Sequence, residues 1–394
     1  MRWVLALGTV GLMGLYQSSL MVSLPWMIEH SGLSAGLWSV LMAVGMILVV
    51  IGGPLWGRQA DQRGAGPIMR LTLGLVVVGY MVLVLALIGG GAGWWLIGAV
   101  AMARLLHGLG AGGVFPSTQR FLLSSRPPSR WSVELAQLQA ANQIGRLAGP
   151  GLMAVASLLS VPLGLSAIAV AGLALWVLQW RQVGGVTGGA VPSTEPVTPP
   201  GWRPDWPLYL LALMITTWVG LLQFVLGPYI QQLLAVDAVA ATRMTGYYLM
   251  LSSVVALVVG PLGHRWLAGR HGLLSGIWLS ALVAGGLVLA VAVTPLGLAV
   301  GIALVVSGLA LATPWYGSLL RGRWPAAQGQ VSGRLTSVHT TGYGIGTLAG
   351  GVALEWAPEQ ALLPFLVLGP LALVCYLAHR RQEVRRVRPH RTGG

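Results

Sequence analysis

Twelve apolar stretches, each long enough to cross a lipid bilayer, take up most of this sequence. An α-helix needs about 20 apolar residues to span the hydrocarbon core, because each residue adds only about 1.5 Å. The pattern therefore predicts an all-α integral, multi-pass membrane protein with twelve transmembrane helices. The expected spans are residues 3–24, 35–57, 67–90, 95–121, 132–158, 161–180, 206–230, 240–262, 272–293, 296–318, 331–354 and 360–378.

The composition agrees with a membrane protein. Only 8% of the residues are charged, whereas soluble domains carry about 25%. The first span resembles a signal peptide, but it is too long for one and lacks a small-residue cleavage site, so we expect it to be retained. The single cysteine, Cys375, excludes an intramolecular disulfide and a cysteine-based metal cluster.

The arginines predict the orientation of the chain. All 23 basic residues are arginine, and the net charge is +14. An even number of spans places both termini on one side, and nearly all loop arginines then share that side, with Arg243 as the exception. The positive-inside rule makes that side the cytoplasm, which predicts a bacterial inner-membrane protein with both termini cytoplasmic. The membrane orientation therefore accounts for the high positive net charge, and we expect the lipid bilayer, and no nucleic acid, as a partner.

A polar segment divides the spans into two groups of six. Residues 184–204 are rich in Gly, Pro and Thr and predict a flexible cytoplasmic linker. We therefore expect an N-terminal six-helix bundle at 1–183, a C-terminal bundle at 205–378 and a basic cytoplasmic tail at 379–394.

The two groups resemble each other in sequence. Gly53-Pro54-Leu55 recurs as Gly260-Pro261-Leu262, and the segment 144–149 recurs as 345–350, with Arg146 replaced by Thr347. Parallel repeats of six spans are one large transporter architecture, with the substrate site between the halves at the membrane midplane. The repeats thus predict two pseudo-symmetric bundles.

Two arginines lie inside expected spans, Arg104 and Arg146. An ionisable side chain near the bilayer centre costs at least ~2.5–3.5 kcal/mol, so it indicates a functional site. No acidic residue lies comparably deep, and these cations therefore predict an anionic small-molecule substrate. Further polar side chains expected at the substrate site are His107, His339, Gln17 and Asn142.

Motifs for enzymatic chemistry are missing from the sequence. No Gly-rich loop with Gly-Lys-Ser/Thr indicates ATP hydrolysis, and no nucleophile elbow indicates a hydrolase. We therefore expect no enzyme, no catalytic residues, no metal site and no cofactor other than a proton as coupling ion.

The segment 57–66 resembles the signature loop of the major facilitator superfamily, Gly-x-x-x-Asp-Arg-x-Gly-Arg. Gly57, Asp61 and Gly64 match, while Gln62 replaces the expected basic residue and Arg63 follows one place later. The resemblance implies a turn after the second span that gates the conformational change. In this turn Gly57 would let helices approach, and Gly64 would permit a left-handed backbone.

Two further elements resemble the same superfamily. Arg104, Gly108 and Gly110 match its Arg-x-x-x-Gly-x-Gly element in span four, where the arginine is associated with proton coupling or with organising the cavity, whatever the charge of the substrate. The specific argument for an anion therefore rests on Arg146. Gly145, Gly149 and Pro150 resemble the Gly-Pro motif of the drug–proton antiporter branch, where Gly spacing allows tight helix contact and proline kinks the helix. This last resemblance implies export.

Together these features predict a monomeric secondary transporter that exports a small organic anion, such as a carboxylate or a siderophore, in exchange for protons. Siderophore exporters of the superfamily fit this description by analogy. Because arginine does not deprotonate, His107 or His339 would carry the proton, with Asp61 a candidate only at the gate. Two alternatives stay open: uptake of an organic anion by proton symport, and a membrane scaffold or receptor that transports nothing.

Overall fold

The structure, a computed structural model, describes residues 2–90, 93–123, 131–182, 205–267, 269–324 and 328–387. Within these ranges the chain is helical and forms no strand, as the apolar spans predict. The helices are α1 (Arg2–Val22), α2 (Leu24–Ser31), α3 (Ala35–Arg63), α4 (Ala65–Ile88), α5 (Trp94–Leu123), α6 (Trp131–Ala156), α7 (Val161–Gln182), α8 (Trp206–Leu233), α9 (Ala238–Trp266), α10 (His271–Ala290), α11 (Pro295–Arg323), α12 (Gln328–Trp356) and α13 (Phe365–Val387), with a short 3-10 helix at Pro358–Gln360.

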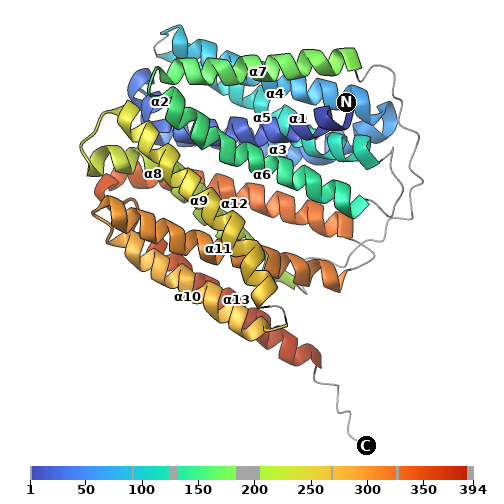
Figure 1. Cartoon of the computed structure of the whole chain (residues 1–394), viewed down its shortest axis with the longest axis vertical. Helices are drawn as coiled ribbons and strands as arrows, with labels where there is room; N and C mark the ends of the chain where they lie inside the picture. Colours follow the sequence, from blue (N-terminus) through green and yellow to red (C-terminus); the bar gives the residue numbers. More distant parts are fainter. Residues whose placement is uncertain are drawn as a thin grey trace, which may run out of the picture. The chain divides into compact units, whose positions relative to one another are not determined.

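All of these α-helices except α2 correspond to an expected span (Figure 1). Nine helices among the described residues are long and apolar enough to cross a membrane. The helices α6, α12 and α13 are not among the nine, so the number of twelve crossings stays a prediction. The all-α membrane fold itself is confirmed.

The first expected span ends earlier than its apolar run. Helix α1 stops at Val22, and α2 begins after Ser23 with Pro25 in its first turn. Proline suits this position because its missing N–H would have no partner in a first turn. Helix α2 ends at Gly32 (φ 65°), and Ser34 then caps α3 by accepting a hydrogen bond from the Leu37 N–H.

The predicted gating turn at 57–66 is much shorter in the structure. Helix α3 continues through Arg63, and α4 begins at Ala65, so Gly64 alone joins them. Gly64 has φ 89°, a conformation that glycine adopts without steric cost. The expectation of positive φ at Gly64 is confirmed, whereas the expectation of a loop from Gly57 to Arg63 is wrong.

The described residues group into two compact units. Unit 1 comprises 1–194, 223–250 and 347–359, and unit 2 comprises 195–222, 251–346 and 360–394. Unit 1 thus combines α1–α7 with parts of α8, α9 and α12. The expected linker at 184–204 lies outside the described residues, and the expected tail is helical as far as Val387.

Glycines set the helix spacing in unit 1. Helix α5 lies beside both α3 and α4 (Figure 1), and a Cβ added at Gly108 would overlap the backbone of Gly45 in α3. On its other side α5 meets α4, where a Cβ at Gly79 would lie 2.7 Å from the Ala103 carbonyl oxygen. Small residues allow such close backbone contact in membrane helices.

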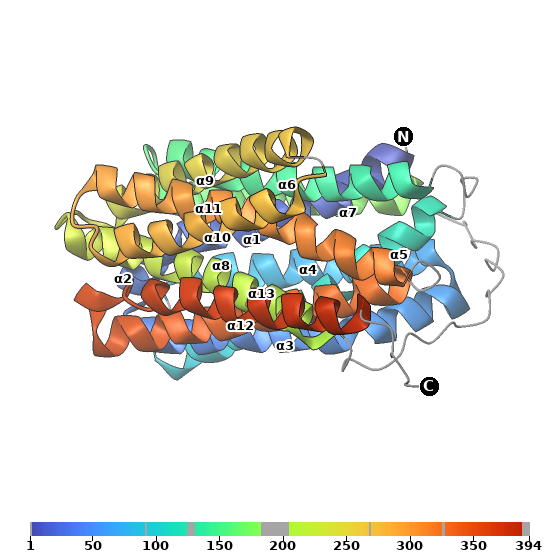
Figure 2. The same cartoon turned by 90° about the horizontal axis from the view of Figure 1, so that it is seen from below.

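The sequence repeat corresponds to a repeated packing arrangement. In unit 1, Gly145 of α6 packs directly against the Gly11 carbonyl of α1, and in unit 2, Gly346 of α12 packs in the same way against the Thr217 carbonyl of α8. Elsewhere in unit 2, α10 packs between α11 and α13 (Figure 2). The Gly-containing segment thus makes equivalent helix contacts in both halves of the chain.

Candidate functional site

Arg104 lies in the middle of α5 and is buried, with 7% of its surface exposed. Its guanidinium lies against Gly45, where an added Cβ would come within 2.9 Å of Nη2. The Nε atom is buried and has no hydrogen-bond partner among the described residues. Burying a cation without an acidic partner is costly, which makes Arg104 a candidate for a functional charge.

No carboxylate of the described residues forms an ion pair with Arg104. The side chains concerned are those of Glu29, Glu134, Asp205, Asp237, Glu355, Glu359 and Glu383. Those with hydrogen bonds find their partners near helix ends, as Glu134 does by accepting from the Trp3 indole at 2.9 Å. This arrangement agrees with the expectation that no acidic side chain lies as deep in an expected span as Arg104 and Arg146.

His107 lies one turn after Arg104 on α5 and is equally buried. Its imidazole hydrogen-bonds to the backbone of Val76 in α4, and its Nδ1 atom has no partner in the described part of the chain. Residues three apart are neighbours on a helix face, and the structure therefore places Arg104 and His107 together, as predicted.

Two tyrosines complete this buried cluster. Tyr16 of α1 stacks on Tyr80 of α4, with ring centroids 3.9 Å apart, and lies 6.4 Å from the His107 ring. The Tyr80 hydroxyl lies 3.0 Å from the Ser19 hydroxyl, whereas the buried Tyr16 hydroxyl is unpartnered in the described ranges. Sequence analysis missed these residues, although a tyrosine inside an apolar span is itself a signal for a buried polar group.

Arg146 and Asn142 line the contact between α6 and α1. A Cβ at Gly14 would lie 3.0 Å from Arg146 Cγ and would overlap the Asn142 carbonyl oxygen. Gln17 follows Gly14 by three residues and therefore lies on the same face of α1. The structure thus places Arg146 and Asn142 at one contact with α1, and all three predicted site residues are half-buried.

The Gly-Pro element of α6 is a packing site. Gly149 lies directly against the Ser18 side chain of α1, and the Pro150 carbonyl lies 2.9 Å from where a Cβ of Gly246 would stand. Both contacts belong to unit 1. The predicted tight contact at Gly149 is confirmed, and Pro150 lies inside α6 as expected.

The structure supports the predictions for some of the remaining gating residues and contradicts others. Gly108 makes the close helix contact expected of it, whereas a Cβ at Gly57 would meet nothing within 4 Å. The interpretation of Gly57 as a contact glycine is therefore wrong. Arg63 is exposed at the last turn of α3, and Asp61 lies in that helix with its side chain outside the described residues.

His339 belongs to unit 2, apart from the residues above. Its Nε2 atom lies 2.8 Å from the hydroxyl of Tyr316 on α11, and the two rings meet edge to face with centroids 5.9 Å apart. Tyr316 is fully buried and His339 is half-buried. A tyrosine–histidine hydrogen bond thus lies within this unit.

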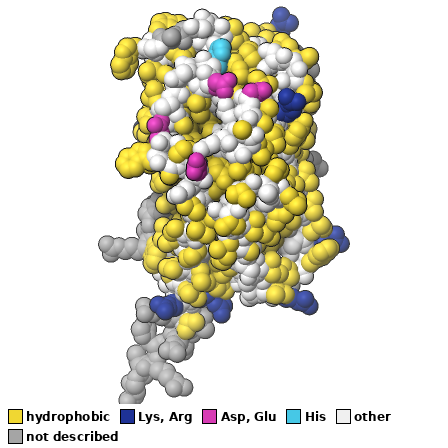
Figure 3. All heavy atoms as spheres, turned by 90° about the vertical axis from the view of Figure 1, so that its left-hand side faces the viewer, with side chains coloured by type: hydrophobic (Ala, Val, Ile, Leu, Met, Phe, Trp, Pro, Cys, Tyr) yellow, Lys and Arg dark blue, Asp and Glu magenta, His cyan; other side chains and the backbone are white. Residues whose placement is uncertain are grey.

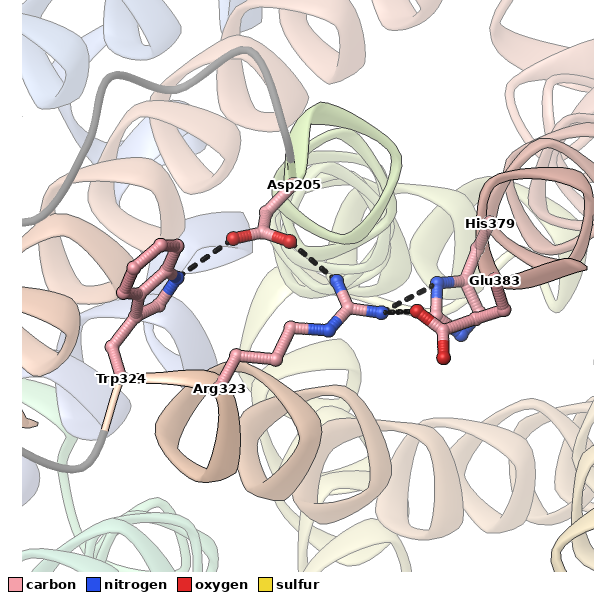
Figure 4. A network of polar contacts seen from close by, with 5 residues as sticks. All are labelled: Asp205, Arg323, Trp324, His379 and Glu383. Carbon is pink, nitrogen blue, oxygen red and sulfur yellow. Dashed lines mark hydrogen bonds and ion pairs between the residues drawn. The ribbon is translucent and has the colours of Figure 1, made fainter. Parts of the chain in front are cut away.

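A charged network at one end of unit 2 was not anticipated (Figure 4). Arg323, in the last turn of α11, forms ion pairs with Asp205 and Glu383, and its Nη2 lies 3.4 Å from His379 Nδ1. The Trp324 indole donates to Asp205 at 2.8 Å. The network ties the residue before α8 to the ends of α11 and α13.

Acidic side chains gather toward one end of the face that Figure 3 presents. In unit 1, four carboxylates lie near or just beyond helix ends: Glu29, Asp237, Glu355 and Glu359. Glu355, just after the expected span 331–354, accepts a hydrogen bond from the Gly36 N–H at 2.8 Å in the first turn of α3. Glu29 accepts from Gln231 at 2.7 Å. Hydrogen bonds from Ser34 and Gly36 hold the pKa of Glu355 below its usual value. Both contacts join the first half of the chain to the second.

Comparison with known proteins identifies the type of fold. The sequence profile of the Major Facilitator Superfamily matches residues 6–319. No curated protein matches the sequence. Among solved structures, the chain is similar to a bacterial homologue of the human lysosomal transporter Spinster, with 15% identity, 96% of each chain covered and a TM-score of 0.71.

Two more solved structures illustrate the range of similar folds. A peptide transporter, POT, in complex with sulfate has 16% identity over 97% of this chain and 94% of its own, with a TM-score of 0.74. The human organic anion transporter MFSD10 has 18% identity over 95% of this chain and 98% of its own, with a TM-score of 0.66. At such identities the likeness concerns the fold alone.

Proposed function

This chain belongs to the major facilitator superfamily, and solved structures to which it is similar are those of membrane transporters. We propose that it exports a small organic anion in exchange for protons. In this proposal the two halves of the chain alternately open a central site to either side of the membrane. The transported anion is a carboxylate or a catecholate of the siderophore type.

A single observation carries the anion proposal: unit 1 holds two arginines within expected spans, half-buried Arg146 of α6 and buried Arg104 of α5, and no described carboxylate forms an ion pair with Arg104. A buried arginine retains its proton, so its charge raises the potential around it in a medium of low dielectric constant. An organic cation would be repelled there. An anion entering the same unit would be stabilised.

Arg146 supplies the direct contact in this proposal. It is half-buried, Asn142 lies at the same contact of α6 with α1, and Gln17 follows Gly14 of that contact by three residues. A guanidinium can bind a carboxylate through two parallel hydrogen bonds, and neighbouring amides can donate more. We assign recognition of the anion to Arg146, Gln17 and Asn142, with Arg104 contributing charge from the buried side.

The direction of transport rests on the Gly149-Pro150 element, which resembles that of exporters. The fold does not decide it, because one fold serves many substrates and both directions. Uptake by proton symport is therefore the alternative outcome of the transport test below. A scaffold without transport is the remaining alternative.

Binding of defined probes tests the anion proposal. The purified protein is titrated with radiolabelled citrate, 2,3-dihydroxybenzoate and, as a cation, tetraphenylphosphonium. We expect binding of at least one anion and none of the cation. Arg146→Gln replaces the charged guanidinium with a neutral amide that can still donate hydrogen bonds. It should weaken anion binding at least about tenfold, since a charged hydrogen bond contributes about 1.5–3 kcal/mol.

Arg181→Gln is the matched control, because Arg181 is exposed in the last turn of α7. Its anion affinity should equal that of the parent protein. Binding of the cation alone, or equal anion affinity in Arg146→Gln and the parent, would refute the proposal.

Vesicles of both orientations then decide the direction. In inside-out vesicles with an acidic interior, an exporter accumulates the bound anion. An importer driven by symport accumulates it instead in right-side-out vesicles with an acidic exterior. Absence of movement in both preparations, with binding intact, would favour the scaffold.

A further inference from the structure

The chain offers two histidines within expected spans, one in each unit: His107 and His339. A proton-coupled transporter needs a group that gains and loses a proton near neutral pH. Histidine does so, and arginine does not. The deepest described carboxylate, Glu134, lies in the first turn of α6. The surroundings of the two histidines therefore decide which one carries the proton.

The surroundings of His107 oppose protonation. Arg104 lies one turn away, and both side chains are 7% exposed. Two positive charges so close in a medium of low dielectric constant repel each other strongly. The ring is also enclosed by Tyr16 and by the backbone of α4, so water has little access to it.

The surroundings of His339 favour reversible protonation. It is half-buried on α12, and the buried hydroxyl of Tyr316 lies 2.8 Å from its Nε2. A tyrosine hydroxyl donates to a neutral imidazole and accepts from a protonated one. This hydrogen bond can therefore form in both protonation states, with the Tyr316 hydroxyl as donor in one and as acceptor in the other.

Near His339, α12 packs against α8 and α11. On its own helix, Arg334 lies five residues earlier and hydrogen-bonds with Tyr209 of α8. Gly342 follows His339 by three residues and packs against Thr216 of α8. Helix α11 contributes Tyr316. Arg334 is thus the nearest cation in sequence, and it is hydrogen-bonded to Tyr209.

We propose that His339, positioned by Tyr316, carries the coupling proton, while His107 stays neutral beside Arg104. The step is a proton binding to a ring nitrogen lone pair of His339 to give imidazolium, followed by loss of the same proton to the other side of the membrane. This assignment builds on the proposed proton-coupled function and separates the proton site in unit 2 from the anion-binding arginines in unit 1.

Nitrogen NMR of the full-length protein tests the assignment without any substrate. The protein is labelled with ¹⁵N-histidine, placed in lipid nanodiscs and titrated from about pH 5 to pH 8, the range in which histidine changes charge. The variant His339→Gln should lose one titrating ring signal. His107→Gln should lose a signal that does not move over this range.

Tyr316→Phe keeps the histidine and serves as a second variant. Since a hydrogen bond to the charged ring is about twice as strong as one to the neutral ring, its loss should lower the titration midpoint of His339 by about one pH unit. No other histidine signal should move.

The assignment is overturned if the ring of His339 does not titrate, if that of His107 does, or if Tyr316→Phe leaves all midpoints unchanged. Failure of the anion proposal would leave these spectra unaltered, because no anion is added. The two proposals therefore fail separately.

Discussion

The contact between Gly79 and α5 predicts how sensitive the Arg104–His107 turn is to helix spacing. In Gly79→Ala, the new Cβ would lie 2.7 Å from both the Ala103 carbonyl oxygen and the backbone nitrogen of His107. Ordinary van der Waals contact begins at 3.4 Å, so the two helices would have to separate by about 0.7 Å. Both opposing atoms belong to the backbone and cannot move aside independently.

The expected cost follows from this overlap. Overpacking of a well-packed core costs about 1–3 kcal/mol, whereas replacing an unconstrained helical glycine by alanine gains up to about 1 kcal/mol. Gly98→Ala provides that reference on α5 itself, because a Cβ there would meet nothing within 4 Å. We therefore expect Gly79→Ala to be about 2 kcal/mol less stable than Gly98→Ala.

Reversible unfolding in mixed micelles of mild detergent and SDS measures this difference for the parent and both variants. Anion binding reports on the site in parallel: Gly79→Ala should weaken it, since the turn that carries Arg104 moves, and Gly98→Ala should not. Equal unfolding free energies for the two variants would show that α4 and α5 are not held by this contact.

Three further predictions concern other contacts. Gly45→Ala should displace the Arg104 guanidinium by about half an ångström, from 2.9 Å to ordinary contact at 3.4 Å, and should press on the Arg104 carbonyl oxygen at 3.1 Å, so it should reduce anion affinity in binding assays and lose less unfolding free energy than Gly79→Ala. The contact between Glu355 and Gly36 should weaken as the pH falls below about 4.5: a carboxyl whose pKa is lowered by its contact stabilises that contact at higher pH, and loses this effect on protonation. Spin labels on both sides of this contact should therefore separate in acid, and Glu355→Gln should abolish this pH dependence. Arg323→Gln should destabilise the protein more than Arg181→Gln on heating, because it leaves two carboxylates without their ion pair.

Much of the fold follows from the sequence because the bilayer limits the options. Backbone groups in lipid must be satisfied within the helix, so each apolar run becomes a helix. The repeat of the segment 144–149 at 345–350 likewise indicates the equivalent packing of α6 and α12, since only glycine permits the close approach observed at Gly145 and Gly346.

Other features were not predictable from the sequence because they depend on helix rotation and on distant partners. The stack of Tyr16 on Tyr80 requires the faces of α1 and α4 to be known. Arg323 pairs with Asp205 and Glu383, which lie 118 and 60 positions away in the sequence, and no local pattern indicates these pairs. The motif-based turn at 57–66 was misplaced because a sequence motif does not say where a helix ends.

The two buried tyrosines bear on why Arg104 can stay charged without a carboxylate. Aromatic rings have electron-rich faces, and the stacked pair packs beside the His107 ring, one turn from the arginine. A carboxylate in that place would neutralise Arg104 and remove its attraction for an anion. Neutral aromatic and imidazole groups fill the space instead, so the positive charge remains available. The same composition makes His107 a poor proton carrier, and for that reason recognition of the anion in unit 1 and proton binding at His339 in unit 2 are best assigned to different groups.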